Sequence, residues 1–371
     1  MNSITLLIKP VSGLCNLRCK YCFYADVVGN RQNPQYDIMD EGTLETVVRK
    51  AFAYSDRYCF FMFQGGEPTL AGLDFYKKLI YLQKLYNRNN LIIQNSIQTN
   101  SIILTEEWIE FFHDNNFLVG LSLDGTEEIH NSFRTDAAGN GTYNRVIESI
   151  KLLEKYKVDY NILCVVTNKV AQNGKAVYHA LKRYRHLQFI PCLDDLDGTE
   201  CDFSLKSKNY GEFLKITFDE YYNDIKNNSY TSVRNFDNYV RILNGNAPEN
   251  CSMSGKCSYY FVIDGNGSVY PCDFFAFDKW KIGDVKNDSF IRMTKSDTVT
   301  KFVDDPLHIN EKCENCRWFF LCKGGCRRNR EPFENNIPAR NIYCESYIDF
   351  FEYTFKRLKE ISCISASKIS I

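Results

Sequence analysis

Sixteen cysteines are unevenly spread along this chain of 371 residues, and two groups of them have spacings that suit metal clusters. The first group is the triplet Cys15, Cys19 and Cys22. The second is a late group of eight: Cys251, Cys257, Cys272, Cys313, Cys316, Cys322, Cys326 and Cys344. The triplet can hold three irons of a [4Fe–4S] cluster and leave the fourth open to an outside molecule. Eight thiolates can fill every iron site of two further clusters.

Zinc is the alternative metal for both groups, because paired Cys-x₂-Cys units also suit zinc. A closed structural zinc site takes four ligands, and no histidine stands near the triplet in sequence. The remaining cysteines are interpreted as small structural side chains; they are Cys59, Cys164, Cys192, Cys201 and Cys363. The first residues do not resemble a secretion leader, so we expect a cytoplasmic protein. In the reducing cytoplasm, clustered cysteines more often bind metal than form disulfides.

The segments that must position these cysteines alternate between two periodicities. Apolar, β-rich runs at 4–8, 59–63, 91–97, 117–123, 160–166 and 187–192 predict strands. The segments at 40–54, 75–86, 105–115, 143–156 and 171–185 have the apolar spacing of helices. This alternation predicts an α/β fold with a parallel sheet, either a six-stranded partial (β/α)₆ barrel or an open twisted sheet. Functional side chains are then expected on loops at the C-terminal ends of the strands.

The pattern changes after residue 205. Helices are expected at 210–223 and 233–243, and Asp264-Gly265-Asn266-Gly267 predicts a β-hairpin that ends near Cys272. A last helix is expected at 347–358. We therefore divide the chain into a barrel at 1–205, a helical connection at 206–250, a cysteine-rich domain at 251–346, and a C-terminal helix and tail at 347–371.

The segment Cys15-Asn16-Leu17-Arg18-Cys19-Lys20-Tyr21-Cys22, directly after the first strand, resembles the signature of radical S-adenosylmethionine (SAM) enzymes. In that family the open iron binds SAM, and reduction cleaves SAM to methionine and a 5′-deoxyadenosyl radical that removes a hydrogen atom from substrate. Gln64-Gly65-Gly66-Glu67-Pro68 is similar to the family's SAM-binding loop, where glycines let the backbone approach a ligand. The resemblance implies that SAM is contacted by Tyr21, Gly66, Ser122, Arg134 and Leu193.

The late cysteines resemble those of the SPASM domain, a C-terminal extension of some radical SAM enzymes. The resemblance implies two auxiliary [4Fe–4S] clusters and a partition of their ligands. Auxiliary cluster I would be held by Cys251, Cys257, Cys272 and Cys326, and auxiliary cluster II by Cys313, Cys316, Cys322 and Cys344. With the triplet, this gives three [4Fe–4S] clusters, and SAM is the cosubstrate. Because no iron of the auxiliary clusters would remain open, they are expected to carry electrons.

The stretch Tyr270-Pro271-Cys272-Asp273-Phe274 resembles that of the anaerobic sulfatase-maturating enzymes, as do Cys22-Phe23-Tyr24 and the run at 318–328. These enzymes oxidise a Cys or Ser of an unfolded sulfatase to Cα-formylglycine. The resemblance implies that the radical takes a Cβ hydrogen, Asp273 removes the thiol or hydroxyl proton, and an auxiliary cluster takes the remaining electron. Tyr24 and Gln64 would position the substrate. Burial beside anionic clusters is expected to raise the pKa of Asp273 and so make it a better base.

The composition of the chain limits the classes of partner that we expect it to bind. Lys and Arg number 45 against 46 Asp and Glu, so bulk attraction to nucleic acid is not expected. No apolar stretch reaches the ~20 residues of a membrane helix, so no membrane partner is expected. We expect instead an unfolded sulfatase or peptide substrate and a low-potential electron donor such as flavodoxin or ferredoxin. The alternatives are another SPASM enzyme that forms thioether or carbon–carbon crosslinks in peptides, a zinc-stabilised adaptor, and a non-catalytic iron–sulfur electron carrier.

Overall fold

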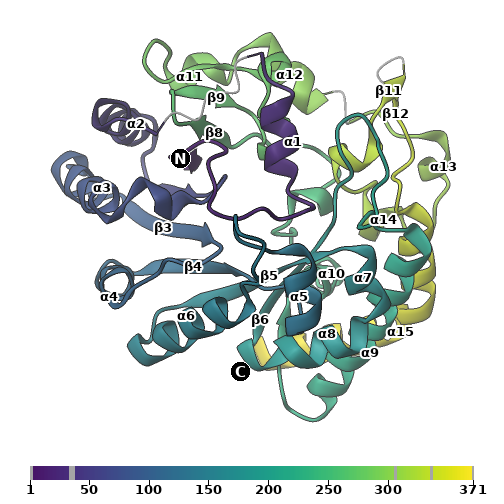
Figure 1. Ribbon diagram of the computed structural model, residues 1–371. Helices are drawn as coiled ribbons and strands as arrows, with labels where there is room; N and C mark the ends of the chain where they lie inside the picture. The colour runs from purple at the N-terminus through teal and green to yellow at the C-terminus, as the bar shows by residue number, and fades with distance from the viewer. Residues whose placement is uncertain (1–2, 33–37, 305–306, 335–336, 370–371) are drawn as a thin grey trace.

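The computed structural model describes residues 3–32, 38–304, 307–334 and 337–369. Its main feature is a twisted sheet whose central strands are parallel and follow the order of the sequence (Figure 1). These strands are β1 Ile4–Lys9, β2 Tyr58–Phe63, β3 Ile92–Thr99, β4 Phe117–Ser122, β5 Tyr160–Val166 and β6 His186–Pro191. All six predicted strands are present, and the predicted α/β class with a partial barrel is confirmed.

Helices connect the strands, and most of them cover the outer face of the sheet (Figure 1). They are α1 Phe23–Gly29, α2 Glu41–Tyr54, α3 Leu73–Tyr86, α4 Glu106–Asp114, α5 Glu127–Phe133, α6 Tyr143–Tyr156, α7 Asn168–Gln172 and α8 Gly174–Leu181, which leads into the short η2 Lys182–Tyr184. The single helix predicted at 171–185 is wrong, because Asn173 leaves the helical conformation and Gly174 starts a new helix. Asn and Gly are weak helix formers, so the chain is divided at this pair.

The strands bury one face more deeply than the other. In β2, Cys59, Phe61 and Phe63 are buried, whereas the residues between them are half-buried, and β5 shows a similar alternation. Side chains alternate between the two faces of a strand. The deeply buried set therefore packs under the helices, and the other set faces the interior of the partial barrel.

The predicted hairpin is present, and it continues the barrel sheet beyond β1. β8 Phe261–Asp264 pairs parallel to β1, and β9 Ser268–Tyr270 and β10 Gly283–Asp284 follow in antiparallel order. On the opposite edge, β7 Ser232–Val233 pairs parallel to β6. The complete order is β10-β9-β8-β1-β2-β3-β4-β5-β6-β7. In the β1–β8 register Lys9 lies opposite Asp264, so two charged residues meet at the C-terminal end of β1.

The second half of the chain is mainly helical. α9 Ser207–Lys226, α10 Arg234–Leu243 and α15 Cys344–Ile369 pack on one another near β6 (Figure 1). Short elements complete the described chain: η1 Pro68–Ala71, η3 Cys251–Met253, η4 Asp273–Phe275, η5 Asp278–Trp280, α11 Phe290–Met293, α12 Asp297–Asp304, α13 Glu311–Glu314, α14 Phe319–Cys322, η7 Arg327–Arg330, β11 Phe333–Glu334 and β12 Ile337–Pro338. Within the described ranges, no helix is long and apolar enough to span a membrane. The domain boundaries at 205, 250 and 346 stay predictions.

Candidate active site

The loop after β1 carries the cysteine triplet, and donors from other strand ends reach its sulfurs. The side-chain amide of Asn100, after β3, lies 3.8 Å from Cys15 Sγ, and Nη1 of Arg134 lies 3.7 Å from Cys19 Sγ. Burial raises the pKa of Cys15 to about 11 and that of Cys19 to about 12. The charge of Cys22 adds to both rises, and the charge of Cys15 adds to the rise at Cys19, so the three cysteines lie close to one another. A bound metal favours the thiolate forms that burial disfavours.

Asp124, fully buried after β4, holds the groups around the triplet in place. Its carboxylate accepts hydrogen bonds from Arg134 Nε at 2.8 Å, from the Val165 amide at 2.9 Å and from the Tyr21 hydroxyl. Its own amide donates to His130 Nδ1 at 3.3 Å, and burial lowers the pKa of His130 to about 4. The imidazole is therefore neutral near pH 7 and accepts that hydrogen bond. Asp124 thus fixes both Tyr21 and Arg134.

The glycine-rich loop after β2 packs against the loop that carries the triplet. A Cβ at Gly66 would lie 2.2 Å from the Leu14 carbonyl oxygen, and that oxygen accepts a 2.8 Å hydrogen bond from the Glu67 amide. The buried Glu67 carboxylate accepts hydrogen bonds from Thr99 Oγ1 and from the Asn100 amide, both at 2.7 Å. Position 66 therefore requires glycine, because a side chain there would collide with the Leu14 carbonyl group. Glu67 links the ends of β2 and β3.

The residues predicted to contact SAM are placed around the C-terminal ends of the strands. Ser122 ends β4, and its hydroxyl accepts a 3.1 Å hydrogen bond from Gln98 Nε2. Leu193, half-buried, follows β6. Gly66 follows β2, and Tyr21 and Arg134 donate hydrogen bonds to Asp124. The carboxyl ends of parallel strands meet at one edge, where ligands of such folds bind. The contacts of these five residues with SAM stay predictions.

Asp273 is buried and lies in a group that contains both residues predicted to position the substrate. The Tyr24 hydroxyl donates a 2.5 Å hydrogen bond to Asp273 Oδ2, and the Gln64 side chain interacts with the same hydroxyl. Burial raises the pKa of Asp273 above its ordinary value, in the expected direction, while Lys9 and Tyr24 oppose the rise. The structure therefore brings Tyr24, Gln64 and Asp273 together, and their catalytic roles stay predictions.

Lys9 is a member of this group that the sequence analysis missed. It is fully buried at the end of β1, with Nζ 3.7 Å from Asp273 Oδ1 and 4.6 Å from the centre of the Tyr24 ring. A second buried ion pair, Arg31 with Asp264 at 2.6 Å, stands beside it because Asp264 is opposite Lys9 in the sheet. The available signal was a lysine that ends a mostly apolar strand, a costly place for an unpaired charge.

The eight late cysteines converge as two sets. In the first, burial raises the pKa values of Cys257, Cys272 and Cys326, and each of these thiols is also affected by the charge of Cys251. In the second, burial raises the pKa values of Cys313 and Cys322, and both respond to the charges of Cys316 and Cys344. The members of each set agree with the partition implied by the resemblance. That each set ligates a cluster stays a prediction.

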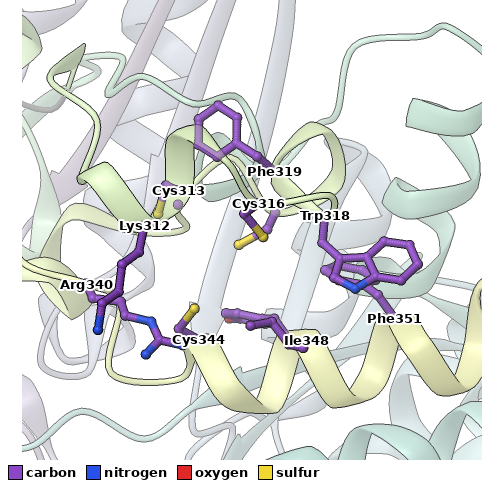
Figure 2. Close-up of a pocket in the computed structure, with 12 residues that line it drawn as sticks. Lys312, Cys313, Cys316, Trp318, Phe319, Arg340, Cys344, Ile348 and Phe351 are labelled. Atoms are coloured by element: carbon purple, nitrogen blue, oxygen red, sulfur yellow. The ribbon is translucent and has the colours of Figure 1, made fainter.

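The second set surrounds a cavity of about 100 Å³ (Figure 2). Figure 2 shows the sulfurs of Cys313, Cys316 and Cys344 around a common space, and Cys322 also lines it. A hydrogen bond to Cys344 raises the pKa of Arg340. In the described part of the chain, no three His, Cys, Asp or Glu side chains converge tightly enough to hold a single metal ion. Four thiolates around an open space, with a cation beside them, fit a larger iron–sulfur cluster.

Two family models match the chain in the regions that carry these groups. The radical SAM superfamily model matches residues 10–171, which contain the triplet and the glycine-rich loop. The model of the SPASM iron–sulfur cluster-binding domain matches residues 251–317. These two matches confirm the predicted superfamily and the presence of the second, cysteine-rich region.

Curated relatives align along nearly the whole chain. A cysteine-type anaerobic sulfatase-maturating enzyme of Clostridium novyi (strain NT) is 45% identical over 366 residues, with 98% of both chains covered. A serine-type enzyme of Bacteroides thetaiotaomicron is 30% identical, with 94% of this chain and 88% of the relative covered. The identity to the cysteine-type relative is therefore clearly the higher of the two.

Solved structures agree with these relatives. The structure of native anSMEcpe with bound AdoMet and Cp18Cys peptide has a TM-score of 0.93 and 43% identity, with 97% of this chain and 99% of that chain covered. Streptococcus suis SuiB bound to its precursor peptide SuiA shares the fold alone, at a TM-score of 0.62 and 16% identity, over 92% of this chain and 76% of that one. With close sequence identity over almost its full length, the chain belongs to the anaerobic sulfatase-maturating enzymes, radical SAM proteins with a SPASM domain.

Proposed function

We propose that this chain oxidises one cysteine of a sulfatase-derived peptide to Cα-formylglycine. The observation that carries the proposal is the buried carboxylate of Asp273, which directly follows Cys272 of the first late set and accepts a hydrogen bond from Tyr24. A base in this position can take a proton from the substrate next to a site that accepts electrons. The 45% identity to a cysteine-type relative, against 30% to a serine-type one, supports cysteine as the target.

The proposed cofactors are three [4Fe–4S] clusters and SAM. The triplet would hold the cluster that binds SAM, and the first and second late sets would hold auxiliary clusters I and II. When bound and reduced, this machinery supplies the 5′-deoxyadenosyl radical that removes a Cβ hydrogen from the substrate. The chain's contribution is to hold SAM at the strand ends, through Tyr21, Gly66, Ser122, Arg134 and Leu193.

The two oxygens of Asp273 have different surroundings, which supports a division of roles. Oδ2 accepts the hydrogen bond from Tyr24, whereas Oδ1 has no hydrogen-bond partner among the described residues and faces Lys9 at 3.7 Å. We assign the substrate thiol proton to Oδ1. Loss of the Cβ hydrogen acidifies the thiol, and burial raises the pKa of Asp273, so both changes make this transfer easier. Tyr24 and Gln64 keep the carboxylate oriented.

The proposed partners are an unfolded sulfatase or peptide and a low-potential electron donor such as flavodoxin or ferredoxin. Neither nucleic acid nor a membrane is proposed as a partner, and the proposed location is the cytoplasm. The proposed units are a radical SAM barrel at 1–205, a helical connection at 206–250, a SPASM domain at 251–346 and the C-terminal helix and tail.

The test is turnover of a defined peptide by the protein reconstituted with iron and sulfide without oxygen. The reaction contains SAM, a strong reductant and a peptide with a Cys-x-Pro-x-Arg sequence, and a second reaction contains its Ser counterpart. Mass spectrometry is expected to show replacement of the CH₂–SH group by an aldehyde, together with 5′-deoxyadenosine. Asp273→Asn should abolish the aldehyde, whereas the exposed control Asp278→Asn should not.

Three other outcomes would contradict parts of the proposal. Formation of 5′-deoxyadenosine without any change in the peptide would show that the substrate class is wrong. A thioether or carbon–carbon crosslink would favour another peptide-modifying SPASM activity. Faster turnover of the Ser peptide than of the Cys peptide would refute the proposed target residue.

A further inference from the structure

Arg330 is a buried arginine in the cysteine-rich region, on η7 shortly after Cys326. Its side chain is 6% exposed, and its Nε has no hydrogen-bond partner among the described residues. Gly324 makes room for it, because a Cβ at Gly324 would lie 3.3 Å from Arg330 Nη1. A buried guanidinium without a carboxylate partner is costly, so a compensating negative charge is expected close by. Within the described ranges, no carboxylate forms an ion pair with Arg330, unlike Arg340, which pairs with Glu345.

The groups around Arg330 that can carry the compensating charge are cysteines of both late sets, which are thiolates when they ligate a cluster. Burial lowers the pKa of Arg330, and Cys257 and Cys326 of the first set and Cys313 of the second set oppose that shift. Arg330 also lines a narrow cavity together with Cys313 and Gly324. Arg330 therefore lies beside a cysteine of the second set and close enough to the first set for its charge to act on both.

The charges of the neighbouring arginines reach the first set alone, Arg327 acting on Cys257 and Arg328 on Cys326, and both side chains have further partners. Arg327 lies 3.2 Å from Glu331 Oε1 and donates to the Phe302 carbonyl at 3.0 Å. Arg328 donates to the Asp194 carbonyl at 2.8 Å. Arg330 is thus the arginine of η7 whose charge is directed to the cysteines of both sets.

We propose that Arg330 is a counter-charge shared by the two auxiliary clusters and that it raises the reduction potential of both together. This inference rests on the proposed function, in which both sets ligate [4Fe–4S] clusters. Four thiolates make each site anionic, and one-electron reduction makes it more so, so a buried cation favours the reduced form. Transfer of one electron from the first site to the second oxidises one cluster and reduces the other, with no atom exchanged. A cation shared by both sites raises the affinity of each for an electron and keeps that transfer nearly balanced.

The experiment is a redox titration of the full, anaerobically reconstituted protein, followed by electron paramagnetic resonance. Arg330→Gln removes the charge, and Arg330→Lys keeps it as a shorter, compact cation. The matched control is Arg317→Gln, since Arg317 is exposed and stacks on Trp318 at 4.5 Å. Arg330→Gln is expected to weaken reduction of both auxiliary clusters about tenfold, which is about 59 mV for one electron. The cluster of the triplet should be unchanged, and Arg317→Gln should change every cluster less than twofold.

Arg330→Lys keeps the inference testable if the Gln variant fails to assemble its clusters. The Lys variant is then expected to weaken reduction of both auxiliary clusters together, by less than tenfold. A shift of one auxiliary cluster alone, shifts of opposite sign, or no shift in a fully loaded variant would overturn the inference. Failure of the proposed function is distinguishable, because it would appear in the wild type as fewer than three clusters by iron and sulfide analysis or as an unmodified peptide.

Discussion

Gly65→Ala tests how the glycine-rich loop and the proposed base are connected. Gly65 has a φ of +93°, and a Cβ built on it would lie 2.5 Å from Cε and 2.8 Å from Cγ of Lys9. Lys9 is fully buried and stands 3.7 Å from Asp273 Oδ1, so its side chain has little free space in which to move. An alanine at this position must therefore displace Lys9 or shift the loop that follows β2.

The expected cost has two parts. An L-residue with positive φ costs about 1–2 kcal/mol, and forcing an extra methyl group into a packed interior costs about 1–3 kcal/mol. Gly65→Ala should therefore lower the free energy of unfolding by about 2–5 kcal/mol. Gly139→Ala is the control, because Gly139 has a φ of +84° and nothing within 4 Å of an added Cβ. It should show the conformational cost alone.

Anaerobic guanidinium denaturation of the four members of a double-mutant cycle measures the clash with Lys9 directly. The cycle combines Gly65→Ala with Lys9→Ala, which removes the Cγ and Cε atoms that the new methyl group would meet. Gly65→Ala should cost about 1–3 kcal/mol less in the Lys9→Ala background. Equal costs in both backgrounds, or a cost no larger than that of Gly139→Ala, would refute the reasoning.

Three further predictions concern buried titratable groups. Burial raises the pKa of Asp273 and Lys9 lowers it, so Lys9→Met should raise that pKa further. Because the proposed base acts in its ionised form, the acidic limb of the pH profile of kcat/KM should move to higher pH. Burial lowers the pKa of His130 to about 4, so as the pH falls below about 6.5 the imidazole is protonated in the unfolded chain before it is protonated in the folded one. Denaturation should therefore show that the free energy of unfolding falls by about 2 kcal/mol from pH 7 to pH 5, and His130→Gln should remove this loss. Glu67→Gln should lower the free energy of unfolding by about 1–3 kcal/mol, because an amide nitrogen would face the Asn100 N–H donor; an unchanged denaturation midpoint would contradict this.

The strand order of the barrel was accessible from sequence because each strand is followed by a helix and pairs with its neighbour in the chain. β8 was not accessible in this way. Its apolar run and the following Gly-Asn-Gly turn predicted a hairpin, but its pairing with β1 joins residues 6–9 to residues 261–264. Hydrophobic periodicity reports which face of a strand is buried and carries no information about a partner so far away in the chain. The division at Asn173-Gly174 was visible in the residue types, although the longer helical periodicity hid it.

The candidate site was predictable where its chemistry depends on residue types at fixed spacings in the sequence. The cysteine triplet, the glycine-rich loop and Asp273 stand in short motifs, and the structure places each at a strand end or in the cysteine-rich region. Lys9 and Arg330 belong to no such motif. Each is a single buried cation whose partners come from distant segments, so its importance depends on the three-dimensional fold rather than on local sequence.

The pairing of β8 with β1 makes the surroundings of the proposed base a joint product of two distant regions. Lys9 and Arg31 come from the first strand and the segment after it, whereas Asp264 and Asp273 come from the hairpin and the turn that follows. Two buried cations therefore balance two buried anions, and removing one partner of such a pair costs about 3–5 kcal/mol. The charged groups that shift the pKa of Asp273 thus also hold the hairpin against β1. It follows that separating the barrel from the cysteine-rich region would leave Lys9 and Arg31 without their partners and the barrel without its proposed base.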